Sequence, residues 1–118
     1  MEEFKPFTIV RPWGEFRQLT HNSTSTVKIH RIKPNQENSL QSHKKRSEFW
    51  YIISGGGKIV IDDKELEANP GDEFTAELGA KHRWIAGPSG MVLAEVATGD
   101  FDEEDIIRYK DDYGRAQK

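Results

Sequence analysis

The stretch that decides the fold of this chain is QSHKKRSE, residues 41–48. Gln41 and His43 are two residues apart, so in an extended strand their side chains leave the same face. A polar, basic turn then leads to Glu48, and a hairpin over this turn would bring all three side chains to one point. His82, on a later predicted strand, supplies a fourth donor. Two imidazoles, a carboxylate and an amide oxygen suit a divalent cation, so this stretch predicts a metal site.

The rest of the chain reads as short β segments separated by turns, with no convincing helix before the C-terminus. Short, regular strands of this kind indicate a small barrel or sandwich. We therefore predict an all-β fold in a single domain over residues 1–118, ending in a short helical or irregular tail. The predicted strands are residues 26–33, 39–43, 48–54, 58–61, 65–68, 73–76, 82–86 and 91–97.

Strand 48–54 has apolar side chains on both of its faces. If Glu48 points inward, alternation places Trp50 and Ile52 on the same inner face. The outer face is equally apolar and needs cover from a second sheet or from a partner subunit. A two-sheet sandwich and a homodimer interface explain this pattern equally well. The inner set is completed by Ser54, and the outer set is Phe49, Tyr51 and Ile53.

Composition sets broad limits on the class of protein. The chain has 118 residues, 31% of them charged, and a net charge of −3, whereas a nucleic-acid-binding domain usually carries a strong basic excess. It has no cysteine, which excludes disulfides and thiol chemistry. The first residues lack the basic start and apolar core of a secretory signal, and no apolar run reaches membrane-spanning length. A cytoplasmic location without membrane contact is the default expectation.

Two spaced motifs resemble those of the cupin family. Residues 35–55 follow the pattern N-x5-Q-x-H-x4-E-x6-G, which is similar to the first cupin motif, and residues 71–82 resemble the second. Within cupins the chain most resembles the C-terminal domain of type II phosphomannose isomerases, which is found fused to mannose-1-phosphate guanylyltransferases and also carries Gln-x-His. The shared segments are RPWG at 11–14, SLQSH at 39–43, RSEFW at 46–50, ISG at 53–55, HR at 82–83 and EDIIRYKDDYGR at 104–115.

This resemblance implies a double-stranded β-helix (cupin or jelly-roll) barrel around one metal ion. The implied ligands are Gln41, His43, Glu48 and His82. Zinc is the first choice, and manganese, iron, cobalt or nickel accept the same nitrogen and oxygen donors. The implied reaction is the interconversion of mannose 6-phosphate and fructose 6-phosphate, in which the metal acts as a Lewis acid on the developing enediolate.

That reaction also needs a base and a site for the substrate's phosphate. Glu95 and Lys28 are the candidate bases, and a structural ion pair is the alternative for each. Arg46 is the first candidate for the phosphate and matches the family's arginine, because a guanidinium binds phosphate through two hydrogen bonds. Further candidates for substrate binding are Lys44, Lys45, Arg108 and Trp50, although core packing is the alternative for the tryptophan.

Three hypotheses about function follow. The first is a metal-dependent sugar-phosphate isomerase acting on a hexose phosphate. The second keeps the metal but changes the chemistry, since cupins also include epimerases and dioxygenases. The third is a non-catalytic module that binds metal and sugar. Lys44, Lys45 and Phe49 stand where the family usually has histidine, and these substitutions favour the third hypothesis.

Overall fold

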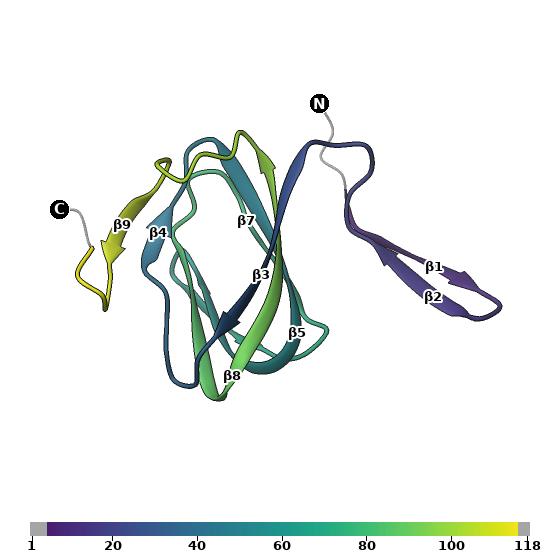
Figure 1. The fold of residues 1–118 in the computed structure, drawn as a ribbon, viewed down its shortest axis with the longest axis horizontal. Coiled ribbons are helices and arrows are strands. Elements are labelled where there is room, and N and C mark those ends of the chain that lie inside the picture. The colour runs from purple at the N-terminus through teal and green to yellow at the C-terminus, as the bar shows by residue number, and fades with distance from the viewer. Residues whose placement is uncertain (1–4, 116–118) are drawn as a thin grey trace.

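The computed structural model describes residues 5–115, in which every regular element is a strand (Figure 1). The all-β prediction is therefore confirmed. One sheet has two strands and the other has seven, and all the pairings are antiparallel. The strands are β1 (Phe7–Arg11), β2 (Gly14–Gln18), β3 (Ser25–Ile32), β4 (Leu40–Ser42), β5 (Arg46–Ile61), β6 (Lys64–Ala68), β7 (Glu73–Ala76), β8 (His82–Gly99) and β9 (Ile107–Lys110).

Two long strands, β5 and β8, pair with each other along most of their length and form the central pair of the barrel. The sequence predicted four shorter strands here, with breaks near residues 55–57 and 87–90. The glycines at these breaks bend the strands instead of ending them, and the register of the pair shifts between Gly55 and Gly57. Each long strand therefore contributes to both halves of the barrel.

The barrel interior is filled by the side chains that alternation placed on the inner face. Trp50 and Ile52 have no exposed surface, and they pack in one cluster with Ile59, Trp84 and Leu93. Each large apolar side chain buried in this way contributes about 1.5–3 kcal/mol to stability. Ser54 is the exception to the predicted parity. It is exposed because the register shifts between Ile52 and Ser54 and turns the following side chain outward.

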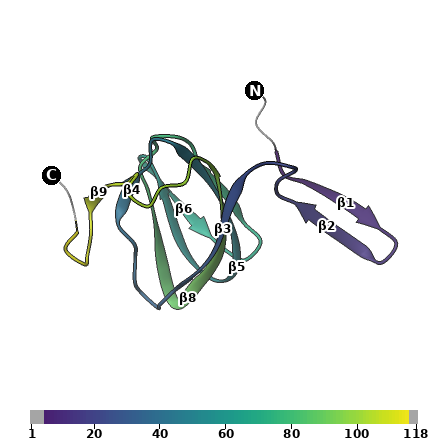
Figure 2. The same ribbon diagram turned by 45° about the horizontal axis from the view of Figure 1, so that its top comes forward.

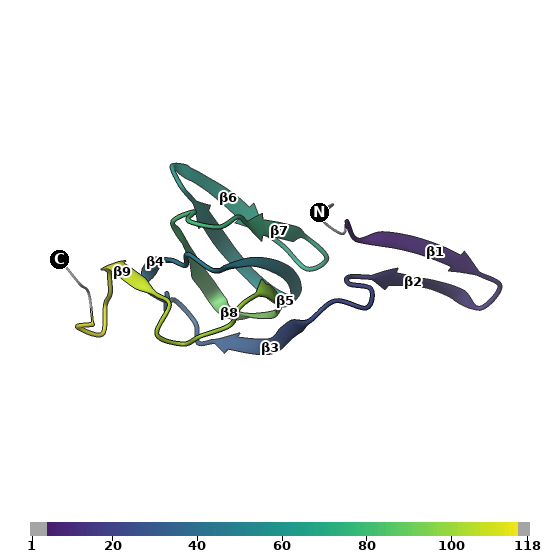
Figure 3. The ribbon, with the colours of Figure 1, turned by 90° about the horizontal axis from the view of Figure 1, so that it is seen from above.

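Both ends of the chain differ from the prediction. The tail, expected to be helical or irregular, contains β9, which lies beside β4 (Figure 2). Its partner is more than sixty residues earlier in the chain, so no local sequence pattern predicts the pairing. At the other end, the hairpin of β1 and β2 was not predicted, and it extends away from the barrel (Figure 3). Among residues 5–115, no helix is long and apolar enough to cross a membrane.

Candidate metal centre and ligand cavity

The barrel brings three of the four predicted metal ligands together. His43 follows β4, Glu48 lies on β5 and His82 begins β8. One ligand atom from each of these residues lies within 4.8 Å of the other two, and all three side chains are buried. The pairing of β4 and β8, which sets Gln41 opposite His82, brings these distant parts of the chain together.

Hydrogen bonds determine which nitrogen each histidine presents to this centre. His43 Nδ1 lies 2.7 Å from the carbonyl oxygen of Asp105, and His82 Nδ1 lies 3.1 Å from that of Ala80. A carbonyl oxygen can only accept, so both Nδ1 atoms carry the proton. In the neutral rings both Nε2 atoms then offer lone pairs, at 3.3 and 3.4 Å from the oxygens of Glu48. Metal-binding histidines are usually held in this way.

Two polar atoms of this centre have no hydrogen-bond partner among the described residues. Glu48 Oε1 and His82 Nε2 are buried, and neither makes a hydrogen bond within the described part of the chain. Burying an unsatisfied polar atom costs about 1–3 kcal/mol, and more for a charged one. A cation between these atoms would satisfy both at once, so the residues present fit a metal ion.

The protonation states also suit a cation. Burial would raise the pKa of Glu48, but the interaction with His82 and the hydrogen bond from Arg46 hold that pKa well below its usual value. Burial lowers the pKa of His43, although its hydrogen bond to the Asp105 carbonyl opposes the shift. At neutral pH the carboxylate is therefore ionised and the His43 imidazole is neutral, as metal binding requires.

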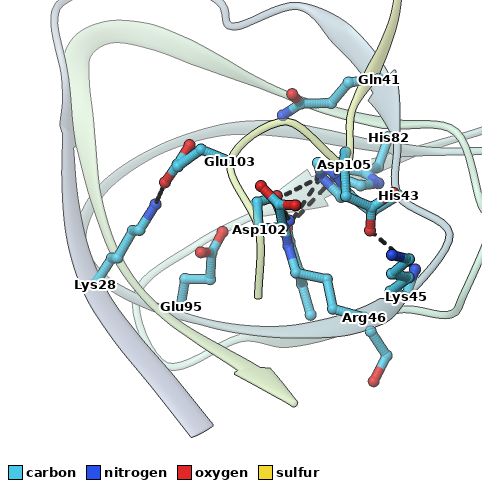
Figure 4. Close-up of polar contacts among 12 residues, drawn as sticks. Lys28, Gln41, His43, Lys45, Arg46, His82, Glu95, Asp102, Glu103 and Asp105 are labelled. Atoms are coloured by element: carbon cyan, nitrogen blue, oxygen red, sulfur yellow. Dashed lines mark hydrogen bonds and ion pairs between the residues drawn. The ribbon is translucent and has the colours of Figure 1, made fainter. Parts of the chain in front are cut away.

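Arg46, predicted to bind phosphate, makes mainly internal contacts. It donates from Nε to Glu48 Oε2 at 2.9 Å, from one terminal nitrogen to the Asp102 carbonyl at 3.1 Å, and from the other to His43 Nε2 at 3.3 Å (Figure 4). Its guanidinium carbon also lies 4.2 Å from the centre of the Phe101 ring. These contacts use three of the five N–H groups of an arginine and tie the C-terminal segment to the metal centre.

A cavity of about 200 Å³ opens beside the metal centre. Gln41, the fourth predicted ligand, lines it, and its Oε1 lies 3.3 Å from the hydroxyl of Ser39. Its role as a ligand stays a prediction. The other lining residues are Lys28, His30, Asn38, Ser39, His43, Arg46, Glu48, Trp84, Glu95, Glu103, Ile106, Arg108 and Arg115.

Both candidate bases lie at this cavity. Glu95 is buried, and its Oε1 is 3.4 Å from His30 Nε2. Lys28 is half-buried and donates to Glu103 at 2.6 Å (Figure 4). Lys28 is therefore held in an ion pair, the alternative considered from the sequence, whereas Glu95 lies beside the half-buried side chain of His30.

Three residues predicted to bind substrate do not line the cavity. Lys44 and Lys45 are exposed, and their backbone N–H groups donate to the carboxylate of Asp105 at 3.0 and 2.9 Å. These bonds lower the pKa of Asp105 and close the turn before β5. Trp50 lies in the core beneath His82, with ring centres 5.1 Å apart, because its strand position points it into the barrel.

The sequence interpretation missed several residues of the cavity, and three of them, His30, Asn38 and Trp84, have polar side-chain atoms buried without a hydrogen-bond partner among the described residues. Strand alternation could have found two of them. Trp84 is two residues after His82 and shares its face, as His30 shares the face of Lys28. Asn38 lies outside the strands, and no pattern in the sequence marks it.

Comparison with known proteins identifies the family. A family model described as "Mannose-6-phosphate isomerase C-terminal" matches residues 2–111. The chain belongs to this family. Its curated relatives include mannose-1-phosphate guanylyltransferase 2 of Escherichia coli O157:H7, which is 35% identical over 89% of this chain and 22% of that protein. The xanthan biosynthesis protein XanB of Xanthomonas campestris is 33% identical over 91% of this chain and 23% of that protein. The chain thus spans less than a quarter of these relatives.

Solved structures confirm the cupin fold. A cupin protein from Bacteroides fragilis superimposes with a TM-score of 0.59 at 21% identity, over 69% of this chain and 74% of that one. ChmJ, a 3'-monoepimerase from Streptomyces bikiniensis, gives a TM-score of 0.70 at 7% identity, over 87% of this chain and 66% of that one. At these identities the likeness concerns the fold alone.

The prediction that the chain is a mannose-6-phosphate isomerase is wrong in view of these relatives. Several curated relatives are named as mannose-1-phosphate guanylyltransferases, and this chain matches only a small part of each. The error has a physical reason. A set of histidine and carboxylate ligands in a cupin barrel specifies a metal site, and the same site serves different functions. The findings therefore support a cupin domain of guanylyltransferase-like proteins.

Proposed function

We propose that the chain is a metal-binding cupin module that binds a sugar or sugar phosphate in the cavity beside its metal ion. The arrangement of His43, Glu48 and His82 carries this proposal, because two of their buried ligand atoms make no hydrogen bond to any residue that the structure describes. Gln41 is the proposed fourth ligand. Zinc is the proposed ion, with manganese, iron, cobalt and nickel as alternatives.

The relatives suggest which sugar to test first. Several are named for mannose 1-phosphate, so a mannose phosphate is the proposed ligand. A bound divalent ion would supply Lewis-acid character and hold sugar oxygens. The polar cavity lining would provide the remaining contacts, and Arg46 would offer its two uncommitted N–H groups.

One observation favours a second candidate function, proton transfer on a bound sugar as in an epimerase. The buried Glu95 and the half-buried His30 both line the same cavity, and a carboxylate beside an imidazole can move a proton. Exchange of sugar C–H protons for deuterium in heavy water, lost in a Glu95→Gln variant, would support this candidate over simple binding.

The proposed function predicts that sugar binding depends on the metal. Zinc-loaded protein should bind mannose 1-phosphate in a calorimetric titration, whereas protein stripped with a chelator should bind it at least about 10-fold more weakly, because the ion supplies a direct contact. Adding zinc back should restore the affinity. Equal binding by the stripped and loaded proteins would contradict the proposal.

A further inference from the structure

Three of the side chains that line the cavity carry buried hydrogen-bond donors without a partner in the described part of the chain. Asn38 Nδ2, Trp84 Nε1 and Arg108 Nε are all buried, and none makes a hydrogen bond within residues 5–115. All three residues line the cavity that also contains the metal ligands. We call them the donor wall. Buried donors without partners are costly, so such a set indicates a ligand rich in acceptor oxygens.

Strand pairing places Arg108 in a row with two of the predicted metal ligands. Gln41 on β4 lies opposite His82 on β8 and, on its other side, opposite Arg108 on β9. Paired residues on adjacent strands direct their side chains to the same face. Neighbouring strands are about 4.8 Å apart, so the backbones of His82 and Arg108 are about 10 Å apart. One sugar phosphate can span that separation.

Arg108 also differs from the other basic residues of the cavity in its lack of an acidic partner among the described residues. The other basic residues of the cavity wall that could bind an anion have acidic partners: Lys28 pairs with Glu103 at 2.6 Å, Arg46 with Glu48 at 2.9 Å and Arg115 with Asp111 at 2.8 Å. Within the described residues, Arg108 makes no ion pair. A guanidinium without a counter-ion at the wall of a cavity is suited to a phosphate or carboxylate.

Asn38 is oriented by the backbone beside it. Its Oδ1 accepts a hydrogen bond from the backbone N–H of Trp84 at 2.6 Å. The side-chain oxygen is therefore committed, and the NH₂ group remains available to donate. The same bond fixes the Asn38 side chain beside the backbone of Trp84.

We infer that the donor wall binds the anionic group of a sugar phosphate whose hydroxyl groups face the metal ion. This inference rests on the proposed function and adds the ligand class and the residue that recognises it. It moves the predicted phosphate contact from Arg46 to Arg108. Two oxygens of a phosphate monoester match the fork of the guanidinium, and a third can accept from Asn38 or Trp84.

An Arg108→Gln variant tests this inference. Zinc-loaded wild-type protein should bind mannose 1-phosphate at least about 10-fold more tightly than mannose, since an ionic hydrogen bond contributes that much. The variant should lose about 10- to 100-fold in affinity for the phosphate and keep the wild-type affinity for zinc and for mannose. Arg31→Gln, an exposed arginine on β3 that does not line the cavity, is the matched control and should bind like wild type.

The outcomes separate the two proposals. Zinc and sugar binding without a preference for phosphate, or with a preference unchanged in Arg108→Gln, overturns the donor wall and leaves the proposed function intact. Failure of wild-type protein to bind zinc, manganese, iron, cobalt or nickel overturns the proposed function. Inorganic phosphate, titrated into zinc-free protein, then tests the donor wall by itself: binding that is lost in Arg108→Gln supports it, and no binding overturns it.

Discussion

Replacing His82 with alanine should lower the zinc affinity of the protein at least about 100-fold, because even residues behind the metal ligands change affinity by 10- to 100-fold. His82 Nε2 is a buried atom that makes no hydrogen bond within the described residues, and it lies 3.4 Å from Glu48 Oε1. Glu48→Gln should have a similar effect, since it removes the one negative charge among the three ligands. Competition with a chromogenic zinc indicator measures both affinities.

The same loss should be visible in thermal unfolding. At a zinc concentration 100 times its dissociation constant, binding adds about 2.7 kcal/mol to the free energy of unfolding, or about 10 °C for a domain of this size. Wild-type protein should show this increase and His82→Ala should not. His21→Ala is the matched control, because His21 is exposed and lies outside the metal centre. A His82→Ala protein that binds zinc like wild type would refute the metal site.

The second large effect is expected at Gly55. Its φ is +73°, a conformation that costs an L-residue about 1–2 kcal/mol, and a Cβ here would overlap the carbonyl oxygen of Gly90 on the facing strand. The obstacle is backbone, so it cannot move aside as a flexible side chain would. Gly55→Ala should therefore lower the free energy of unfolding by about 3 kcal/mol or more, as the strain and the overlap add.

Gly71→Ala is the matched control for this prediction. Gly71 also has a positive φ, +90°, but a Cβ there would meet nothing within 4 Å. Only the conformational cost remains, so the loss should be about 1 kcal/mol. Urea unfolding of the two variants measures the difference. Equal losses would mean that the close approach of β5 and β8 does not require glycine.

The C-terminal segment illustrates how the site depends on contacts that are remote in sequence. The carbonyl oxygens of Asp105 and Asp102 hold His43 and Arg46, and the carboxylate of Asp105 closes the turn between β4 and β5. These partners lie some sixty residues after the motif they support. The family resemblance includes the tail, but the order of its residues does not predict which carbonyl oxygen forms a hydrogen bond with which histidine.

The sequence by itself determined the β character of the chain, the inward positions of Trp50 and Ile52, and the three residues that meet at the metal centre. These properties follow from the alternation of side chains along a strand and from the spacing of histidine and carboxylate residues in the motif, and both are local features of the sequence. Only the tertiary structure decided that Arg46 turns inward, that Arg108 makes no ion pair within the described residues, and that the hairpin extends away from the barrel. Each of these depends on which strands pair across long stretches of chain, and pairing is decided by the packing of the whole barrel.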